Sequence, residues 1–138
     1  MPPDSALVAE TRDWLAKARE DLDAAERLLV GDLPLTSQAA FHAQQAAEKA
    51  QKAFLTWNSR PFTKTHDLGV RGGMCVEIDP SLATVSSEVA PVSGYAVEPR
   101  YPGPWTVPTL SQAQEALDLA RRLYNELVTR LPGEVSSS

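Results

Sequence analysis

The chain has 138 residues, of which 43% are hydrophobic, and it carries a net charge of −5 and one cysteine. Its length and apolar content favour one globular domain, its acidic charge argues against broad nucleic-acid binding, and a lone cysteine leaves no internal disulfide. Because no apolar run approaches the roughly 20 residues of a membrane helix and residues 1–10 do not resemble a secretory signal, we expect a cytoplasmic protein without membrane attachment.

The first predicted helix runs from a cap at Asp4 or Ser5 to about Val30. Its charged positions mostly fall on the outer face and should be exposed, Asp21 among them. Gly31 is placed to end this helix, and the link that follows is short, so the second helix should run antiparallel to the first. The apolar positions of the first helix recur at intervals of three and four, which predicts one buried stripe: Leu7, Trp14, Leu15, Ala18, Leu22, Ala25, Leu28 and Leu29.

The second predicted helix follows a cap at Thr36 or Ser37 and fades by about Trp57. Residues 39–55, AAFHAQQAAEKAQKAFL, contain no Gly, Pro or β-branched residue, which strongly favours a helix. Small residues on one face should allow another helix to approach closely: Ala39, Ala43, Ala46, Ala47 and Ala50. A polar row lies beside this face at helical spacing: His42, Gln45, Lys49 and Lys52.

The third and fourth predicted helices are less regular. Thr65 is predicted to cap the third, which should be short or irregular because three glycines interrupt it: Gly69, Gly72 and Gly73. Asp79 and Pro80 restart the chain as a fourth helix, since Asp favours the cap and Pro the first helical position. Pro91 and Gly94 should kink or end that helix.

The last predicted helix begins at a capping box of Thr109 and Gln112, after a proline-rich loop. Pro132 and Gly133 should stop it. With no alternating strand pattern and no internal repeat, we expect an all-α fold, an up-and-down four-helix bundle with a short additional helix. A single domain over residues 1–138 should have its core in about residues 5–131, with a flexible tail over residues 132–138.

Four sequence segments together resemble the HEPN family. Trp14, Ala18, Asp21 and Leu22 lie on the first helix, the AAFHAQQAAEKA string and a KTHDL motif follow, and Arg100-Tyr101-Pro102 precedes the last helix. The resemblance covers about residues 6–131 and implies a helical bundle that is often a homodimer, encoded beside a minimal nucleotidyltransferase. Some members are metal-independent ribonucleases, commonly toxins, and others bind nucleotides or act as non-catalytic partners.

For the ribonuclease branch of the family, the resemblance implies a motif in which an Arg is followed four to six residues later by a His. Arg would hold the scissile phosphate, and His would transfer a proton. Arg100 matches the Arg, but no His follows it, which argues against cleavage by this mechanism. Arg60 and His66 have a similar spacing at a different place in the fold, where we interpret His66 as bridging helix ends.

Seven residues are candidates for a ligand site: His42, Gln45, Lys49, Lys52, His66, Arg100 and Tyr101. The two lysines would attract a phosphate and the Gln45 amide would contact a base or ribose. Arg100 would bind a phosphate, and Tyr95 or Tyr101 would stack on a base. Each also has a structural interpretation: His42 as a half-buried bundle residue, the lysines as a solvated helix face, and the Arg100 segment as a packed turn.

The leading hypothesis is a module that binds a nucleotide, an RNA or a partner protein in a groove between the second helix and the Arg100 loop. Its partner would be a nucleotidyltransferase-type protein, and its apolar stripes would form a homodimer. One alternative is a metal-independent ribonuclease toxin of a toxin–antitoxin pair, and another is a structural adaptor. No catalytic residue or cofactor is assigned, and two histidines with one cysteine are too few for a Cys/His metal site.

Overall fold

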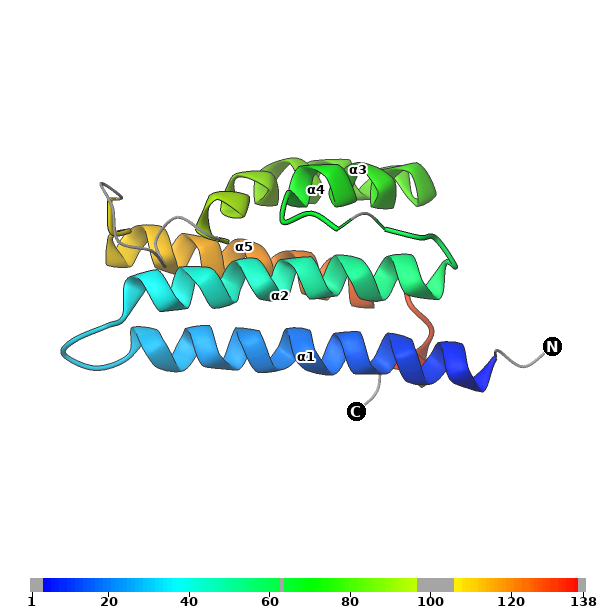
Figure 1. The fold of residues 1–138 in the computed structure, drawn as a ribbon, viewed down its shortest axis with the longest axis horizontal. Coiled ribbons are helices and arrows are strands. Elements are labelled where there is room, and N and C mark those ends of the chain that lie inside the picture. The colour runs from blue at the N-terminus through cyan, green and yellow to red at the C-terminus, as the bar shows by residue number, and fades with distance from the viewer. Residues whose placement is uncertain (1–3, 63, 97–105, 137–138) are drawn as a thin grey trace.

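The computed structural model describes residues 4–62, 64–96 and 106–136, and every regular element within these ranges is helical (Figure 1). Three long helices form the frame: α1 (Ser5–Leu29), α2 (Thr36–Trp57) and α5 (Leu110–Val128). Shorter elements complete it: α3 (Leu68–Ile78), η1 (Pro80–Leu82), α4 (Ala83–Val89), η2 (Ala90–Tyr95) and α6 (Gly133–Ser136). The predicted all-α bundle is confirmed.

Helix α2 lies at the centre of the bundle. It runs antiparallel to α1, packs against α5, and is covered on a third side by α3 and η2 (Figure 1). Its alanine face is fully buried, which allows the close approach of neighbouring helices that the small side chains predict: Ala39, Ala43, Ala46, Ala47, Ala50 and Ala53 have no exposed surface. Three packed neighbours leave α2 only a narrow line of residues in contact with solvent.

The helix starts agree with the sequence at three positions and differ at two. The Asp4 carboxylate caps α1 by accepting from Ala6 N at 2.8 Å, and Thr109 and Gln112 form the predicted capping box of α5. Asp79 caps η1. Helix α2, however, begins at Thr36 without a side-chain cap.

Helix α3 is capped by Asp67 and not, as predicted, by Thr65. The Asp67 carboxylate accepts from the backbone N–H groups of residues 69 and 70, while the Thr65 hydroxyl accepts from the Asp67 N–H. Helix α3 is short, as expected, but its glycines do not interrupt it, since the helix is continuous over its 11 residues. Gly72 serves packing here, because an added Cβ would lie 3.3 Å from the Cβ of Ser86 on α4.

The chain after α5 differs from the predicted tail. Residues 133–136 form α6, and its Val135 side chain is only 2% exposed because it packs against the core.

The expected dimer surface was also wrong, since the apolar stripes of α1 and α5 face the interior. No helix among the described residues is both long and apolar enough to cross a membrane.

Enlarging an alanine of the α2 face tests the close packing. We expect Ala47→Leu to lower the free energy of unfolding by about 1–3 kcal/mol, because the extra atoms have no space between the helices. Ala9→Leu on the exposed face of α1 is the matched control and should change stability little. Urea unfolding followed by circular dichroism measures both, and equal stability of the two variants would contradict the packing argument.

Candidate functional site

One polar stripe of α2 reaches solvent between its packed faces. Within residues 39–52 the half-exposed positions are Phe41 and the four residues of the predicted polar row, which we call the α2 stripe: His42, Gln45, Lys49 and Lys52. The side chains of His42, Lys49 and Lys52 are 33%, 25% and 21% exposed. The α2 stripe is therefore accessible to a ligand while its side chains remain in contact with the protein.

Asp21 of α1 holds two residues of the α2 stripe. Its carboxylate lies 2.8 Å from Nδ1 of His42 and 2.6 Å from Nζ of Lys49, and its side chain is only 10% exposed. The prediction that Asp21 is exposed was wrong, because α2 packs over it. A carboxylate shared by two donors fixes the orientation of both, and it leaves the second ring nitrogen of His42 without this contact.

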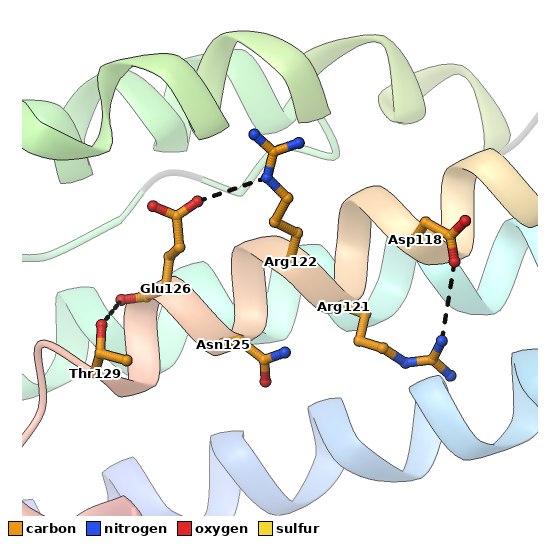
Figure 2. A pocket seen from close by; sticks show the side chains of 6 residues that line it. All are labelled: Asp118, Arg121, Arg122, Asn125, Glu126 and Thr129. Atoms are coloured by element: carbon orange, nitrogen blue, oxygen red, sulfur yellow. Dashed lines mark hydrogen bonds and ion pairs between the residues drawn. The ribbon is translucent and has the colours of Figure 1, made fainter.

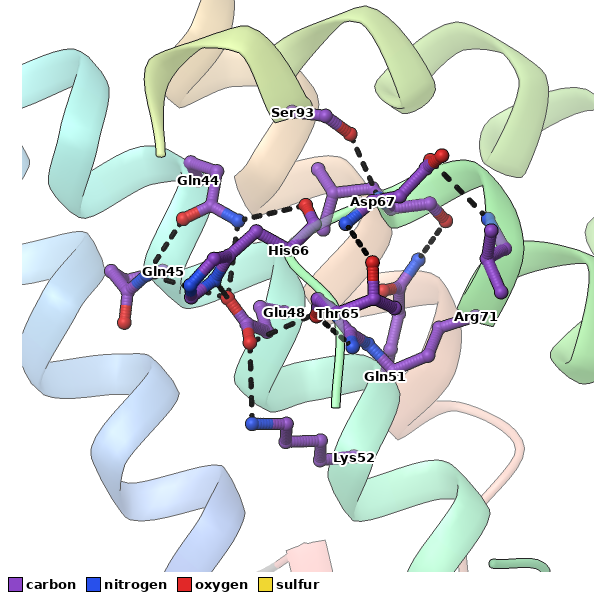
Figure 3. A network of polar contacts seen from close by, with 12 residues as sticks. Gln44, Gln45, Glu48, Gln51, Lys52, Thr65, His66, Asp67, Arg71 and Ser93 are labelled. Carbon is purple, nitrogen blue, oxygen red and sulfur yellow. Dashed lines mark hydrogen bonds and ion pairs between the residues drawn. The ribbon is translucent and has the colours of Figure 1, made fainter. Parts of the chain in front are cut away.

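Glu48 is the second anion beside the α2 stripe, and Figure 3 shows its carboxylate between α2 and the segment that carries His66. Its side chain is 5% exposed, and it lies 3.5 Å from the guanidinium of the fully buried Arg71. His66 Nδ1 lies 3.2 Å away, which supports the interpretation of His66 as a bridge between segments. Other donors complete its contacts: Lys52 at 3.2 Å, Gln44 at 3.1 Å and Gln45 at 3.3 Å.

The same network fixes the chain between α2 and α3 through its backbone (Figure 3). The Gln44 amide donates to the carbonyl of His66 at 3.3 Å, and the Gln51 amide donates to the carbonyl of Leu68 at 2.9 Å. The Arg71 guanidinium donates to the carbonyl of Thr65. Buried amides and a guanidinium thereby replace the hydrogen bonds that this irregular segment does not make to itself.

The pKa values of two buried groups follow from these contacts. Burial raises the pKa of Glu48, but hydrogen bonds from His66 and Gln44 and the charges of Lys52 and Arg71 outweigh it, so that this pKa lies below its usual value. Burial raises the pKa of the Cys75 thiol to about 12. That thiol therefore stays protonated at neutral pH, which makes it a poor nucleophile.

Two aromatic residues border the α2 stripe at its Lys52 end, and neither was identified as a site residue from the sequence. The Lys52 ammonium lies 5.1 Å from the ring centroid of Trp14 and 5.7 Å from that of Phe62. Trp14 was assigned to the apolar stripe of α1, and Phe62 follows the end of α2. No local pattern links them, because the contact joins three separate segments of the chain.

The remaining candidates are the Arg100 segment and the pair of Arg60 and His66. Arg100 and Tyr101 lie outside the described residues, so the predicted second wall of the groove stays a prediction. Arg60 pairs with Glu77, whereas His66 contacts Glu48. The Arg60 guanidinium and the His66 imidazole therefore each serve a different carboxylate.

Hollows on the described surface include one over α5 of about 350 Å³ (Figure 2). Arg122 pairs there with Glu88 at 2.6 Å, and Arg121 pairs with Glu26 of α1 at 3.1 Å. These ion pairs link α5 to its neighbours, which gives the arginines a structural role. The lining includes none of the predicted site residues: Asp118, Arg121, Arg122, Asn125, Glu126 and Thr129.

A comparison of the chain with models of protein families identifies the family to which this helical bundle belongs. The model of the HEPN domain matches residues 11–131, which is most of the chain. The chain belongs to the HEPN domain family. The matched region includes Asp21, Glu48 and the whole α2 stripe, so both anions and the residues they hold lie inside the HEPN domain. Neither the curated proteins nor the solved structures give a match for the chain.

Replacing Glu48 tests its role in the HEPN domain. We expect Glu48→Gln to lower the free energy of unfolding at pH 7 by about 3–5 kcal/mol, because the buried guanidinium of Arg71 would lose the Glu48 carboxylate. A depressed pKa stabilises the fold above the unfolded value of about 4.3, and this stability is lost as pH falls through the folded pKa. The difference between variant and wild type should therefore shrink below about pH 4.

The matched control for this prediction is Glu20→Gln on the exposed face of α1. Chemical unfolding over a series of pH values measures all three proteins. A Glu48→Gln protein as stable as the Glu20→Gln control at pH 7, or a difference that does not change with pH, would contradict the assigned role of Glu48.

Proposed function

We propose that this HEPN domain is a module that binds the phosphate of a nucleotide or an RNA along the α2 stripe. His42 and Lys49 would contact the phosphate, Lys52 would contact a further phosphate along the stripe, and Gln45 would contact the sugar or base beside them. His66 lies at the border of this surface, 60% exposed. The main support for this proposal is the Asp21 carboxylate, which holds His42 and Lys49 side by side. It lies 2.8 Å from Nδ1 of His42 and 2.6 Å from Nζ of Lys49.

Fixed donors favour anion binding for an energetic reason. A free lysine loses side-chain entropy when it binds a ligand, whereas a lysine that is already held in place loses less. The exposed charges of the α2 stripe are cationic, since Lys49 and Lys52 reach solvent while the carboxylates of Asp21 and Glu48 are only 10% and 5% exposed. An anion that approaches the α2 stripe therefore meets ammonium groups before it meets carboxylates, although the chain as a whole has a net charge of −5.

The partners we propose follow from the family resemblance: a nucleotidyltransferase-type protein and a second copy of the chain, in a cytoplasmic setting. Large apolar side chains stay exposed where the α1–α2 link and the start of α5 lie at the same end of the bundle (Figure 1). They offer a contact surface for such a partner in place of the buried stripes: Val30, Leu33, Leu35, Val107 and Leu110.

Ligand binding tests the α2 stripe directly. We expect a nucleoside triphosphate or a short single-stranded RNA to raise the melting temperature and to bind in calorimetry. Lys49→Met keeps the apolar stem and removes the charge, and it should weaken binding about 10- to 100-fold, the effect of one lost charged hydrogen bond. Lys17→Met on exposed α1 is the control. Equal affinities of both variants would exclude the stripe as the site.

A second candidate function is favoured by one contact. His42 beside a buried carboxylate has the geometry of an oriented general base, which a metal-independent ribonuclease would use. We propose that this contact serves binding, because Arg100 is followed by no histidine. Purified protein incubated with RNA in EDTA should therefore leave the RNA intact. Cleavage that disappears in His42→Ala would reject the binding module in favour of the ribonuclease.

A further inference from the structure

An aromatic corner closes one end of the α2 stripe. Trp14 of α1 and Phe62 after α2 meet edge to face, with ring centroids 6.2 Å apart and planes inclined by 81°. Both side chains are half-buried, so they pack on the core and still reach the surface. The Lys52 ammonium lies over both rings. The rings of Trp14 and Phe62 take part neither in the buried network of Glu48 and Arg71 nor in the phosphate contacts proposed above.

We propose that Trp14 and Phe62 form a nucleobase subsite, and that the ligand of the α2 stripe is therefore single-stranded RNA with at least one unstacked base. This inference rests on the proposed function and names its ligand class. Aromatic rings beside a row of cations are the usual means of binding single strands, because every base offers a face for stacking while the cations follow the phosphates.

The length of the stripe agrees with a strand better than with a single nucleotide. His42 and Lys52 are ten residues apart on α2, which corresponds to roughly 15 Å along the helix axis. Successive phosphates of one strand are about 3.4 Å apart along a duplex axis. A ligand that contacts His42 at one end and the aromatic corner at the other is therefore longer than one nucleoside monophosphate.

Stacking on Trp14 requires that Lys52 leave the ring face, and the network tolerates this movement. Glu48 would lose the contact with Lys52 at 3.2 Å. It would keep the guanidinium of Arg71 and the imidazole of His66, so the carboxylate stays paired. The released ammonium of Lys52 lies on a flexible stem and would bind the phosphate next to the stacked base. A base thus replaces the Lys52 ammonium on the ring of Trp14, and the ammonium pairs instead with a phosphate of the RNA backbone.

Fluorescence titration tests the subsite. In a variant that retains Trp14 as its one tryptophan, RNA should quench the emission, whereas inorganic polyphosphate, which has charge but no base, should bind without quenching. Affinity should rise from a mononucleotide to a dinucleotide and longer oligonucleotides. Trp14→Leu or Phe62→Leu should weaken RNA binding about 5- to 100-fold, the effect of one lost base–aromatic stack, with polyphosphate binding unchanged.

The matched control is Trp57→Leu, which removes another half-buried tryptophan from the end of α2. Far-ultraviolet circular dichroism establishes that each variant is folded, and quenching of Trp14 emission gives a readout that needs no substitution at the corner itself. If mononucleotide and oligonucleotide bind equally, without quenching, while Lys49→Met still weakens binding, the subsite is rejected and the phosphate site remains. If no phosphate ligand binds the wild-type protein, both proposals fail.

Discussion

The buried carboxylate of Glu48 is the constraint on which the rest of this HEPN domain depends. A carboxylate and a guanidinium removed from water cost several kcal/mol each, and their attraction repays this only when further hydrogen bonds complete the network. Lys52, His66 and two glutamine amides supply those bonds around Glu48 and Arg71. The conformation of the segment before α3 is therefore determined by the contacts of a buried ion pair as well as by the hydrogen bonds of its own backbone.

The position of the α2 stripe is a consequence of this network and of the alanine face. Because α2 is packed on three sides, its solvent-facing line is narrow, and buried acids lie on either side of it. Asp21 fixes His42 and Lys49 from α1, and Glu48 fixes Lys52 from within α2. A surface built in this way holds His42 and Lys49 in place before a ligand arrives, which lowers the entropic cost of binding.

The two carboxylates also compete with any ligand for the same cations. A phosphate of the ligand must share Lys49 with Asp21 or displace Glu48 from Lys52. Its net binding free energy is most favourable where the carboxylate that loses a lysine keeps other partners. Glu48 retains the guanidinium of Arg71 when Lys52 moves, whereas Asp21 would retain only the imidazole of His42. This difference in retained charge favours movement of Lys52, at the aromatic corner of Trp14 and Phe62. The ion pairs over α5 differ, since Glu88 and Glu26 pair there with arginines that hold neighbouring helices together.

The sequence by itself determined the three long helices, α1, α2 and α5, because periodicity, capping residues and alanine content are local properties of the chain. It also predicted the polar row of α2 and the family. Only the tertiary structure decided what those polar residues contact: Asp21, predicted to be exposed, lies under α2, and Gly72 permits packing where it was expected to break a helix. Trp14 and Phe62 meet Lys52 across three segments. Ion pairs and packing between distant segments depend on how the helices are placed, which local patterns do not specify.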